Sequence, residues 1–140
     1  MIFVLDNSVT MRWFFEDGSP SDLAYADEVL AEINHSGCVV PVTWGLEVAN
    51  VLVRAETKTE VAATRSGAFI GMLQGMNIEV DEDTFARALS DTLQLSRTHK
   101  LSSYDASYLE LALRRRVPLA TLDDDLRKAA KKAGVKILKI

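Results

Sequence analysis

Four acidic side chains of this sequence have the types and positions that phosphate chemistry requires: Asp6, Glu47, Asp105 and Asp123. Each stands near the beginning of a predicted helix, and Asp6 and Asp123 directly follow predicted strands. Carboxylate oxygens bind hard cations, and such cations convert a bound water into a nucleophile and stabilise a leaving oxygen. The four acids therefore predict a Mg²⁺ or Mn²⁺ site for phosphoryl chemistry.

Each of these acids also has a purely structural interpretation. Asp6 and Asp123 suit helix N-caps, which accept hydrogen bonds from free helical amides. Asp105 follows Ser102 at the spacing of a capping box, and Glu47 suits a solvated surface position. Taken singly, these interpretations are the commoner ones, because caps and surface acids are frequent.

Helix geometry favours the chemical interpretation for two of the acids. At about 100° per residue, Asp105 falls within an apolar helix face rather than on a wet one. The residues around it on that face are Tyr108, Leu109 and Ala112. On the segment Thr43–Lys58, apolar side chains cover both broad sides and leave a polar stripe about 60° wide. That stripe consists of Glu47, Asn50 and Arg54. We therefore expect a helix that is buried nearly all round, with this one strip facing a cleft.

Short β-branched runs alternate with helical patterns along the chain. The predicted strands are Ile2–Leu5, Cys38–Pro41, Asn77–Val80, Pro118–Leu122 and Val135–Ile140. The predicted helices are Pro20–Asn34, Thr43–Lys58, Glu60–Met76, Asp83–His99, Ser103–Arg116 and Asp124–Ala133. This alternation predicts an α/β fold with a mainly parallel sheet of roughly five strands and helices on both faces. Ligand sites in such sheets lie outside the carboxyl ends of the strands, where Asp6 and Asp123 are expected.

Composition indicates a folded globular protein, because 48% of the residues are apolar and 26% are charged. A length of 140 residues predicts a single domain over residues 1–140. We expect a cytoplasmic protein, because no apolar run reaches the length of a membrane span and no secretory leader precedes the first strand. The net charge of −4 argues against a protein that simply coats nucleic acid. A nuclease escapes this objection, because bound cations reverse the field of an acidic site.

Four short motifs together resemble the PIN-domain nucleases, particularly the VapC-type toxins of toxin–antitoxin pairs. The first is Val4–Val9, VLDNSV, followed by the run RWFF at Arg12–Phe15. The second is PVTWGLEVANVL at Pro41–Leu52, the third is SYDASY at Ser103–Tyr108, and the fourth is LATLD at Leu119–Asp123. The resemblance covers nearly the whole chain, and the motifs occur in the expected order.

The resemblance implies a three-layer α/β/α sandwich and Mg²⁺- or Mn²⁺-dependent cleavage of RNA phosphodiesters. It also implies a homodimer and a small cognate antitoxin that inhibits it. The metal site would consist of Asp6, Glu47, Asp105 and Asp123. Ser8 and Thr121 match positions that support this site by hydrogen bonding. Asp124 and Asp125 neighbour the fourth acid, and the motif position selects Asp123.

Several cations are candidates for contacts with an RNA backbone. Arg12 follows Asp6 by six residues, and Arg54 shares the polar stripe with Glu47 and the supporting candidate Asn50. Either arginine is placed to contact a phosphate or to tether an acid. The remaining candidates are more simply solvated surface charges: Lys58, Arg65, Arg97, Lys100 and Arg114–Arg116.

Two other functions remain open. One is a PIN-like domain that binds RNA without cutting it, and the presence of all four acids argues against it. The other is a metal-dependent phosphohydrolase of small phosphate esters, because four carboxylates alone do not select a substrate. The sequence contains no Gly-rich phosphate cradle of the P-loop kind, which argues against this second alternative.

Overall fold

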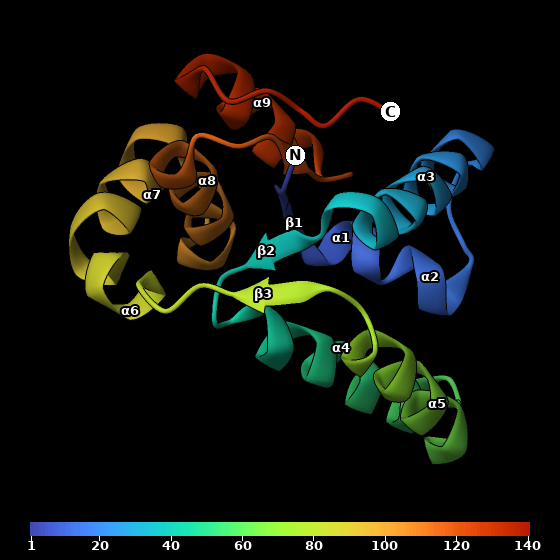
Figure 1. Ribbon diagram of the computed structural model, residues 1–140. Helices are drawn as coiled ribbons and strands as arrows, with labels where there is room; N and C mark the ends of the chain where they lie inside the picture. Colours follow the sequence, from blue (N-terminus) through green and yellow to red (C-terminus); the bar gives the residue numbers. More distant parts are fainter.

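A parallel sheet of four strands forms the centre of the computed structural model, which describes residues 1–140 (Figure 1). The strands are β1 (Phe3–Leu5), β2 (Cys38–Val40), β3 (Ile78–Val80) and β4 (Leu119–Ala120). Their order across the sheet is β3-β2-β1-β4, and every neighbouring pair is parallel. The predicted α/β class with a parallel sheet is confirmed.

The predicted fifth strand, Val135–Ile140, is wrong as a strand. This segment makes a single bridge, between Leu119 and Ile137. Two hydrogen bonds of 2.9 Å hold it, from the amide of Leu119 to the carbonyl of Lys136 and from the amide of Leu138 to the carbonyl of Leu119. Because β4 has only two residues, it offers too short an edge for a fifth strand to pair along.

From Pro20 onward the helices lie close to the predicted ranges, and two short helices before Pro20 lie outside those ranges. The helices are α1 (Asn7–Thr10), α2 (Arg12–Phe15), α3 (Pro20–Ser36), α4 (Trp44–Lys58), α5 (Ala63–Gln74), α6 (Thr84–Arg87), α7 (Leu93–His99), α8 (Ser103–Arg115) and α9 (Asp124–Ala133). The predicted helix Asp83–His99 is interrupted by a π-helical segment, η1 (Ala88–Thr92). The predicted helix from Glu60 begins later, because Glu60 has a left-handed backbone with φ 57°. None of the helices combines the length and apolarity needed to cross a membrane.

Alternating side chains of the strands separate two cores on opposite faces of the sheet. Val4 and Val39 point to the face that α8 and α9 cover. Phe3, Leu5 and Val40 point to the other face, which α1 and α3 cover. Figure 1 shows these helices on opposite sides of the strands, so the predicted arrangement of helices on both faces is confirmed.

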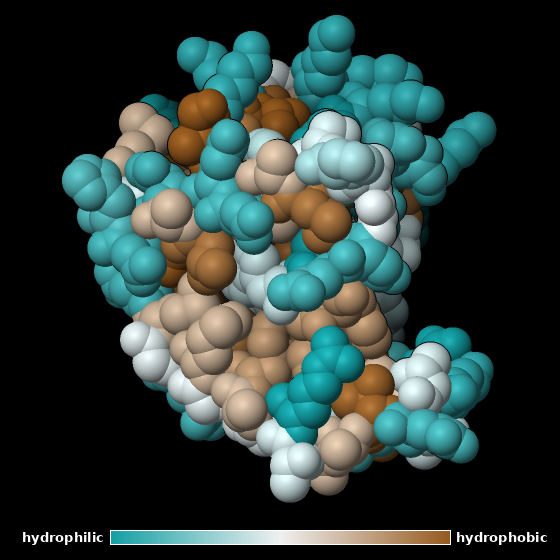
Figure 2. All heavy atoms as spheres, turned by 90° about the vertical axis from the view of Figure 1, so that its right-hand side faces the viewer, coloured by the Kyte–Doolittle hydropathy of each residue, from teal (hydrophilic) through white to brown (hydrophobic).

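Helix α4 differs from its prediction as a helix buried nearly all round. Only one face is buried, through Val48, Leu52 and Ala55, which pack with residues of α2 and α5 in a third core. Leu46 and Val53 on another side are 74% and 52% exposed. Figure 2 shows the side of the molecule that lies to the right in Figure 1. Hydrophobic side chains cover the lower half of this side, at the height of α4 and α5 in Figure 1. The expectation failed because α4 and α5 lie beside the main layers rather than between them.

Candidate active site

Asp6 lies at the carboxyl end of β1, where the order of the sheet changes direction. From β1 the chain moves outward to β2 and β3, and β4 then pairs with the other side of β1. Such a switch point leaves a crevice at the strand ends, which is the usual ligand site of an open parallel sheet. Asp6 is 4% exposed, and its carboxylate makes no capping hydrogen bond to α1. The N-cap interpretation therefore does not account for this buried acid.

Two hydroxyl groups hold the carboxylate of Asp6. Ser8 Oγ donates to its Oδ2 at 2.6 Å, and Thr121 Oγ1 donates to the same oxygen at 2.7 Å. Ser8 Oγ also accepts from the amide of Leu122 at 2.9 Å, and Thr121 Oγ1 accepts from the amide of Asp123 at 3.1 Å. These bonds join the end of β1 to the loop after β4. Ser8 and Thr121 therefore both hydrogen-bond to Asp6. Their support of catalysis stays a prediction.

Asp123 precedes α9 and caps it, as the structural interpretation expects. Its Oδ2 accepts a hydrogen bond of 2.8 Å from the amide of Leu126. The same side chain lies near enough to Asp6 and Asp105 to raise the pKa of each by charge repulsion. Asp123 therefore both caps α9 and lies near the other acids.

Asp105 is the third residue of α8 and lies near enough to Asp6 to be repelled by it. Ser102 caps this helix, and its Oγ accepts from the amide of Asp105 at 3.1 Å. Burial raises the pKa of Asp105 to about 6, and repulsion from Asp6 and then Asp123 adds to the rise. A carboxylate used only to cap a helix would not need to lie within electrostatic range of two other acids.

Glu47 reaches the site from α4 and is oriented by a tyrosine of α8. The hydroxyl of Tyr108 donates to Glu47 Oε1 at 2.7 Å. Burial raises the pKa of Glu47, and repulsion from Asp6 and Asp105 raises it further against the effect of the tyrosine. Tyr108 is fully buried, and from the sequence it was expected only as an apolar neighbour of Asp105. The position of Tyr108, one helical turn after Asp105, is the feature of the sequence that could have indicated a polar role.

The structure thus brings Asp6, Glu47, Asp105 and Asp123 to one end of the sheet. Burial raises the pKa of Asp6 as well, and Asp123 adds to that rise. None of the main influences on the pKa values of Asp6, Glu47 and Asp105 comes from a lysine or arginine. One buried and several half-buried carboxylates that repel one another form an arrangement that a bound metal ion stabilises.

The donor set fits a hydrated hard cation. As the side chains stand, no three His, Cys, Asp or Glu residues come together closely enough to hold a metal ion. Mg²⁺ commonly uses only one or two carboxylates and keeps several waters, so this geometry agrees with its chemistry. The buried Oδ1 of Asn7 has no hydrogen-bond partner and lies with Glu47 on one pocket of about 430 Å³. The donor set therefore suits Mg²⁺ or Mn²⁺ held through one or two of these carboxylates and bound water.

The pocket next to Glu47 gives the site an opening to solvent. Its lining residues are Asn7, Leu46, Glu47, Asn50, Val51 and Tyr104. Asn50 therefore shares the opening with Glu47, as the polar stripe predicted. Arg54 is exposed, forms no ion pair and does not line this pocket.

Arg12 tethers none of the four acids. Its Nη1 instead donates to the carboxylate of Asp17 and, at 2.8 Å, to the carbonyl of Asp17. The reason is local, because the chain turns back after α2 and brings Asp17 to the arginine. Contact of Arg12 with a phosphate stays a prediction.

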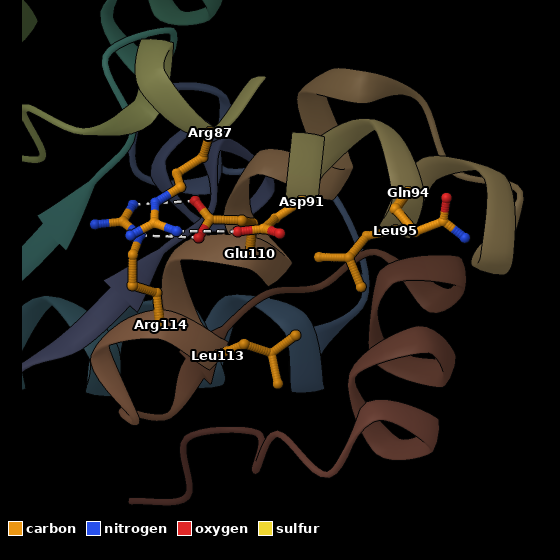
Figure 3. A pocket seen from close by; sticks show the side chains of 7 residues that line it. All are labelled: Arg87, Asp91, Gln94, Leu95, Glu110, Leu113 and Arg114. Atoms are coloured by element: carbon orange, nitrogen blue, oxygen red, sulfur yellow. Dashed lines mark hydrogen bonds and ion pairs between the residues drawn. The ribbon is translucent and has the colours of Figure 1, made fainter. Parts of the chain in front are cut away.

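A second polar cluster, at the opposite end of α8, is an ion-pair network. Arg114 donates to Asp81 at 2.7 and 3.0 Å and to Glu110 at 2.8 and 3.0 Å. Figure 3 shows Arg114 turned toward Glu110 at a hollow that Arg87 and Asp91 also line. Asp81 directly follows β3, just as Asp6 directly follows β1, so the two acids have the same kind of position in the sequence. Because Arg114 is held by both of these buried acids, Asp81 and Glu110, the network is structural, and Arg114 is not free for RNA.

Comparisons with known proteins show what the sequence and the fold are similar to. The sequence model of the family described as "PIN domain" matches residues 3–132. The structure of PAE2754 from Pyrobaculum aerophilum is similar with a TM-score of 0.68 and 21% identity, over 92% of this chain and 87% of that one. FitAcB from Neisseria gonorrhoeae is similar with a TM-score of 0.52 and 19% identity, over 99% of this chain and 97% of that one. No curated protein matches the sequence. At these identities, the two structures show likeness of fold alone.

Proposed function

The chain belongs to the PIN-domain family, whose members are generally metal-dependent nucleases, and from this premise we propose that it is a Mg²⁺- or Mn²⁺-dependent endoribonuclease. We treat residues 1–140 as one nuclease domain that acts in the cytoplasm as the VapC-type toxin of a toxin–antitoxin pair. The observation that carries the proposal is the convergence of Asp6, Glu47 and Asp105, each with a raised pKa and no neighbouring cation.

The residues of the site have distinct parts in this proposal. Asp6 is the fixed acid, because Ser8 and Thr121 hold one of its oxygens and leave the other free. Glu47 and Asp105 join the ligand set from α4 and α8, and Asp123 is its fourth acid while it also caps α9. A bound divalent cation supplies an activated water and neutralises charge on the phosphate. The hydroxyl groups of Ser8 and Thr121 both donate to the acid that is assigned to the metal, so the nucleophile in the proposal is water and not a side chain.

Two partners are included in the proposal. A second copy of the chain fits the exposed apolar pair Phe85 and Leu89, which are four residues apart on α6 and η1 and each 87% exposed. A small antitoxin with an arginine-bearing segment fits the acidic opening beside Glu47, where Leu46 is also exposed. Light scattering tests the dimer, and a monomer that persists at tens of micromolar, roughly the Kd of a modest interface, contradicts it.

An RNA-cleavage assay tests the function itself. The purified chain is incubated with a single-stranded RNA oligonucleotide and either Mg²⁺, Mn²⁺ or EDTA, with single-stranded DNA and p-nitrophenyl phosphate as parallel substrates. We expect RNA cleavage only with metal, because the carboxylates do not activate water unaided. Metal-independent cleavage contradicts the mechanism. Hydrolysis of p-nitrophenyl phosphate without RNA cleavage favours a phosphohydrolase, and RNA binding without hydrolysis favours a silent RNA-binding domain.

A further inference from the structure

The last 15 residues carry a positive charge that contrasts with the rest of the chain. Residues 126–140 contain one arginine, five lysines and no acid, although the whole chain has a net charge of −4. These cations are Arg127, Lys128, Lys131, Lys132, Lys136 and Lys139. A concentrated basic segment in an acidic protein is typical of a surface that meets a polyanion.

Helix α9 presents this charge outward. Its apolar face, formed by Leu126, Ala129 and Ala130, is buried in the core beneath the sheet. The five lysines from Lys128 to Lys139 are all exposed, and none forms an ion pair. Figure 2 shows hydrophilic side chains crowded along the top of the molecule, at the height of α9 and the C-terminal end in Figure 1. The charge of these lysines is therefore available to a ligand.

Two hollows flank the lysines of α9. The larger, of about 900 Å³, is lined by residues of α9 and of the C-terminal segment. Its cations are Arg127, Lys128, Lys131, Lys136 and Lys139. The smaller, of about 560 Å³, lies between α9 and the end of α7, and its cations are Lys100, Lys128 and Lys132. Because Lys128 lines both hollows, they form one continuous basic surface.

The smaller hollow leads toward the candidate active site. Asp125 lines this hollow and is close enough to Asp105 to influence it electrostatically. Along the helix axis, Lys128 and Lys132 lie about 7.5 and 13.5 Å beyond Asp123, at about 1.5 Å per residue. Arg127 Nε also donates to the carbonyl of Thr121 at 2.7 Å and fixes α9 to the loop that holds Asp6. The basic surface and the carboxylates are therefore parts of one rigid unit.

We propose that the basic surface of Lys100, Lys128, Lys131, Lys132, Lys136 and Lys139 binds the phosphate backbone of single-stranded RNA as it leaves the carboxylate site. This inference rests on the proposed ribonuclease function for the identity of the polyanion. Lysine ammonium groups bind phosphates as point charges and do not read base edges, so the surface contributes affinity and no sequence preference. An anionic membrane fits less well, because membrane-surface helices insert their apolar face and that of α9 is buried.

Two variants with the same change of net charge test this surface in the full chain. The first is Lys128→Gln/Lys132→Gln, and the control is Lys58→Glu, which lowers the net charge by the same two units at an exposed, unpaired lysine of α4. Binding of a fluorescent single-stranded RNA is measured by anisotropy in EDTA, so that cleavage is prevented, from 50 to 200 mM salt. Vesicles of phosphatidylserine and phosphatidylcholine serve as a second ligand, and thermal melts verify that both variants are folded.

We expect the Lys128/Lys132 variant to bind RNA at least tenfold more weakly, with a salt slope lower by about 1.4, since each phosphate contact contributes about 0.7 for single strands. The control variant keeps the parent's affinity within about twofold. Equal loss in both variants, no RNA binding by the parent, or a preference for vesicles overturns the proposal. If the parent binds RNA through these lysines but cuts none with metal, the surface stands and the ribonuclease function fails. If the parent cuts RNA and both variants bind it equally, the ribonuclease function stands and the proposal for the basic surface fails.

Discussion

The hydroxyl of Tyr108 donates a hydrogen bond of 2.7 Å to Oε1 of Glu47, and it does so from the opposite side of the candidate site. Tyr108 belongs to α8, which covers one face of the sheet, whereas Glu47 belongs to α4, which packs with α2 and α5. The bond is therefore a link between two cores. It fixes one oxygen of Glu47 and leaves the other for a ligand.

Replacing Tyr108 with phenylalanine tests whether this link positions Glu47. We expect Tyr108→Phe to fold, since only a hydroxyl is removed, and to lose about 10- to 100-fold in cleavage, the usual cost of removing a group that orients a metal ligand. The apparent metal affinity should fall by a similar factor. Tyr25→Phe is the control, because it also removes a hydroxyl that donates a hydrogen bond, here to the carbonyl of Leu138 and away from the four acids. Equal activity of the two variants would remove Tyr108 from the site.

Arg114 provides a stability prediction that is separate from the site. Its partners Asp81 and Glu110 are buried, so Arg114→Leu leaves two acids uncompensated and should lower the free energy of unfolding by about 3 kcal/mol. Arg115→Leu breaks only the pair with Glu79, which is 51% exposed, and should cost less than about 1 kcal/mol. Urea denaturation measures both. Similar losses in the two variants would contradict a structural role for the Arg114 network.

The raised pKa of Asp105 predicts how the stability of the metal-free protein depends on pH. In the unfolded chain this pKa is near the ordinary 3.8, and in the folded chain it is about 6. The folded state therefore binds more protons between these values, and the free energy of unfolding falls as pH rises from about 4 to 6. Thermal melts in EDTA should show this decline in the parent and a smaller one in Asp105→Asn. Identical pH profiles would show that Asp105 is not in a repulsive cluster.

The sequence was sufficient for the elements that depend on local patterns. Strands β1 and β2 are short β-branched runs, and α9 has its caps in the sequence at Asp123 and Gly134. Asp6 was found as a candidate because the carboxyl end of a parallel strand is where ligands bind. These features depend on neighbours within a few residues of the chain.

Features that depend on distant contacts were not predictable. The Tyr108–Glu47 bond joins residues 61 positions apart, and the pairing of Arg114 with Asp81 joins residues 33 positions apart. Helix α4 has an apolar pattern on two sides, but its place outside the main layers leaves one of them exposed. The fifth strand is also absent because of a distant contact. Its formation depends on the length of β4, with which it would pair, rather than on the pattern of Val135–Ile140.

The metal-induced rise in melting temperature of the parent and of Asp105→Asn tests the carboxylate site most directly. If Asp105 is a ligand, saturating Mg²⁺ or Mn²⁺ stabilises the parent by about 2.7 kcal/mol at a hundredfold excess over Kd. The variant should be at least as stable as the parent without metal, because one repelling charge is gone, and it should gain much less from metal and cleave no RNA. Equal metal-induced shifts in parent and variant, with cleavage retained, would contradict the assignment of Asp105 and the four-acid site with it.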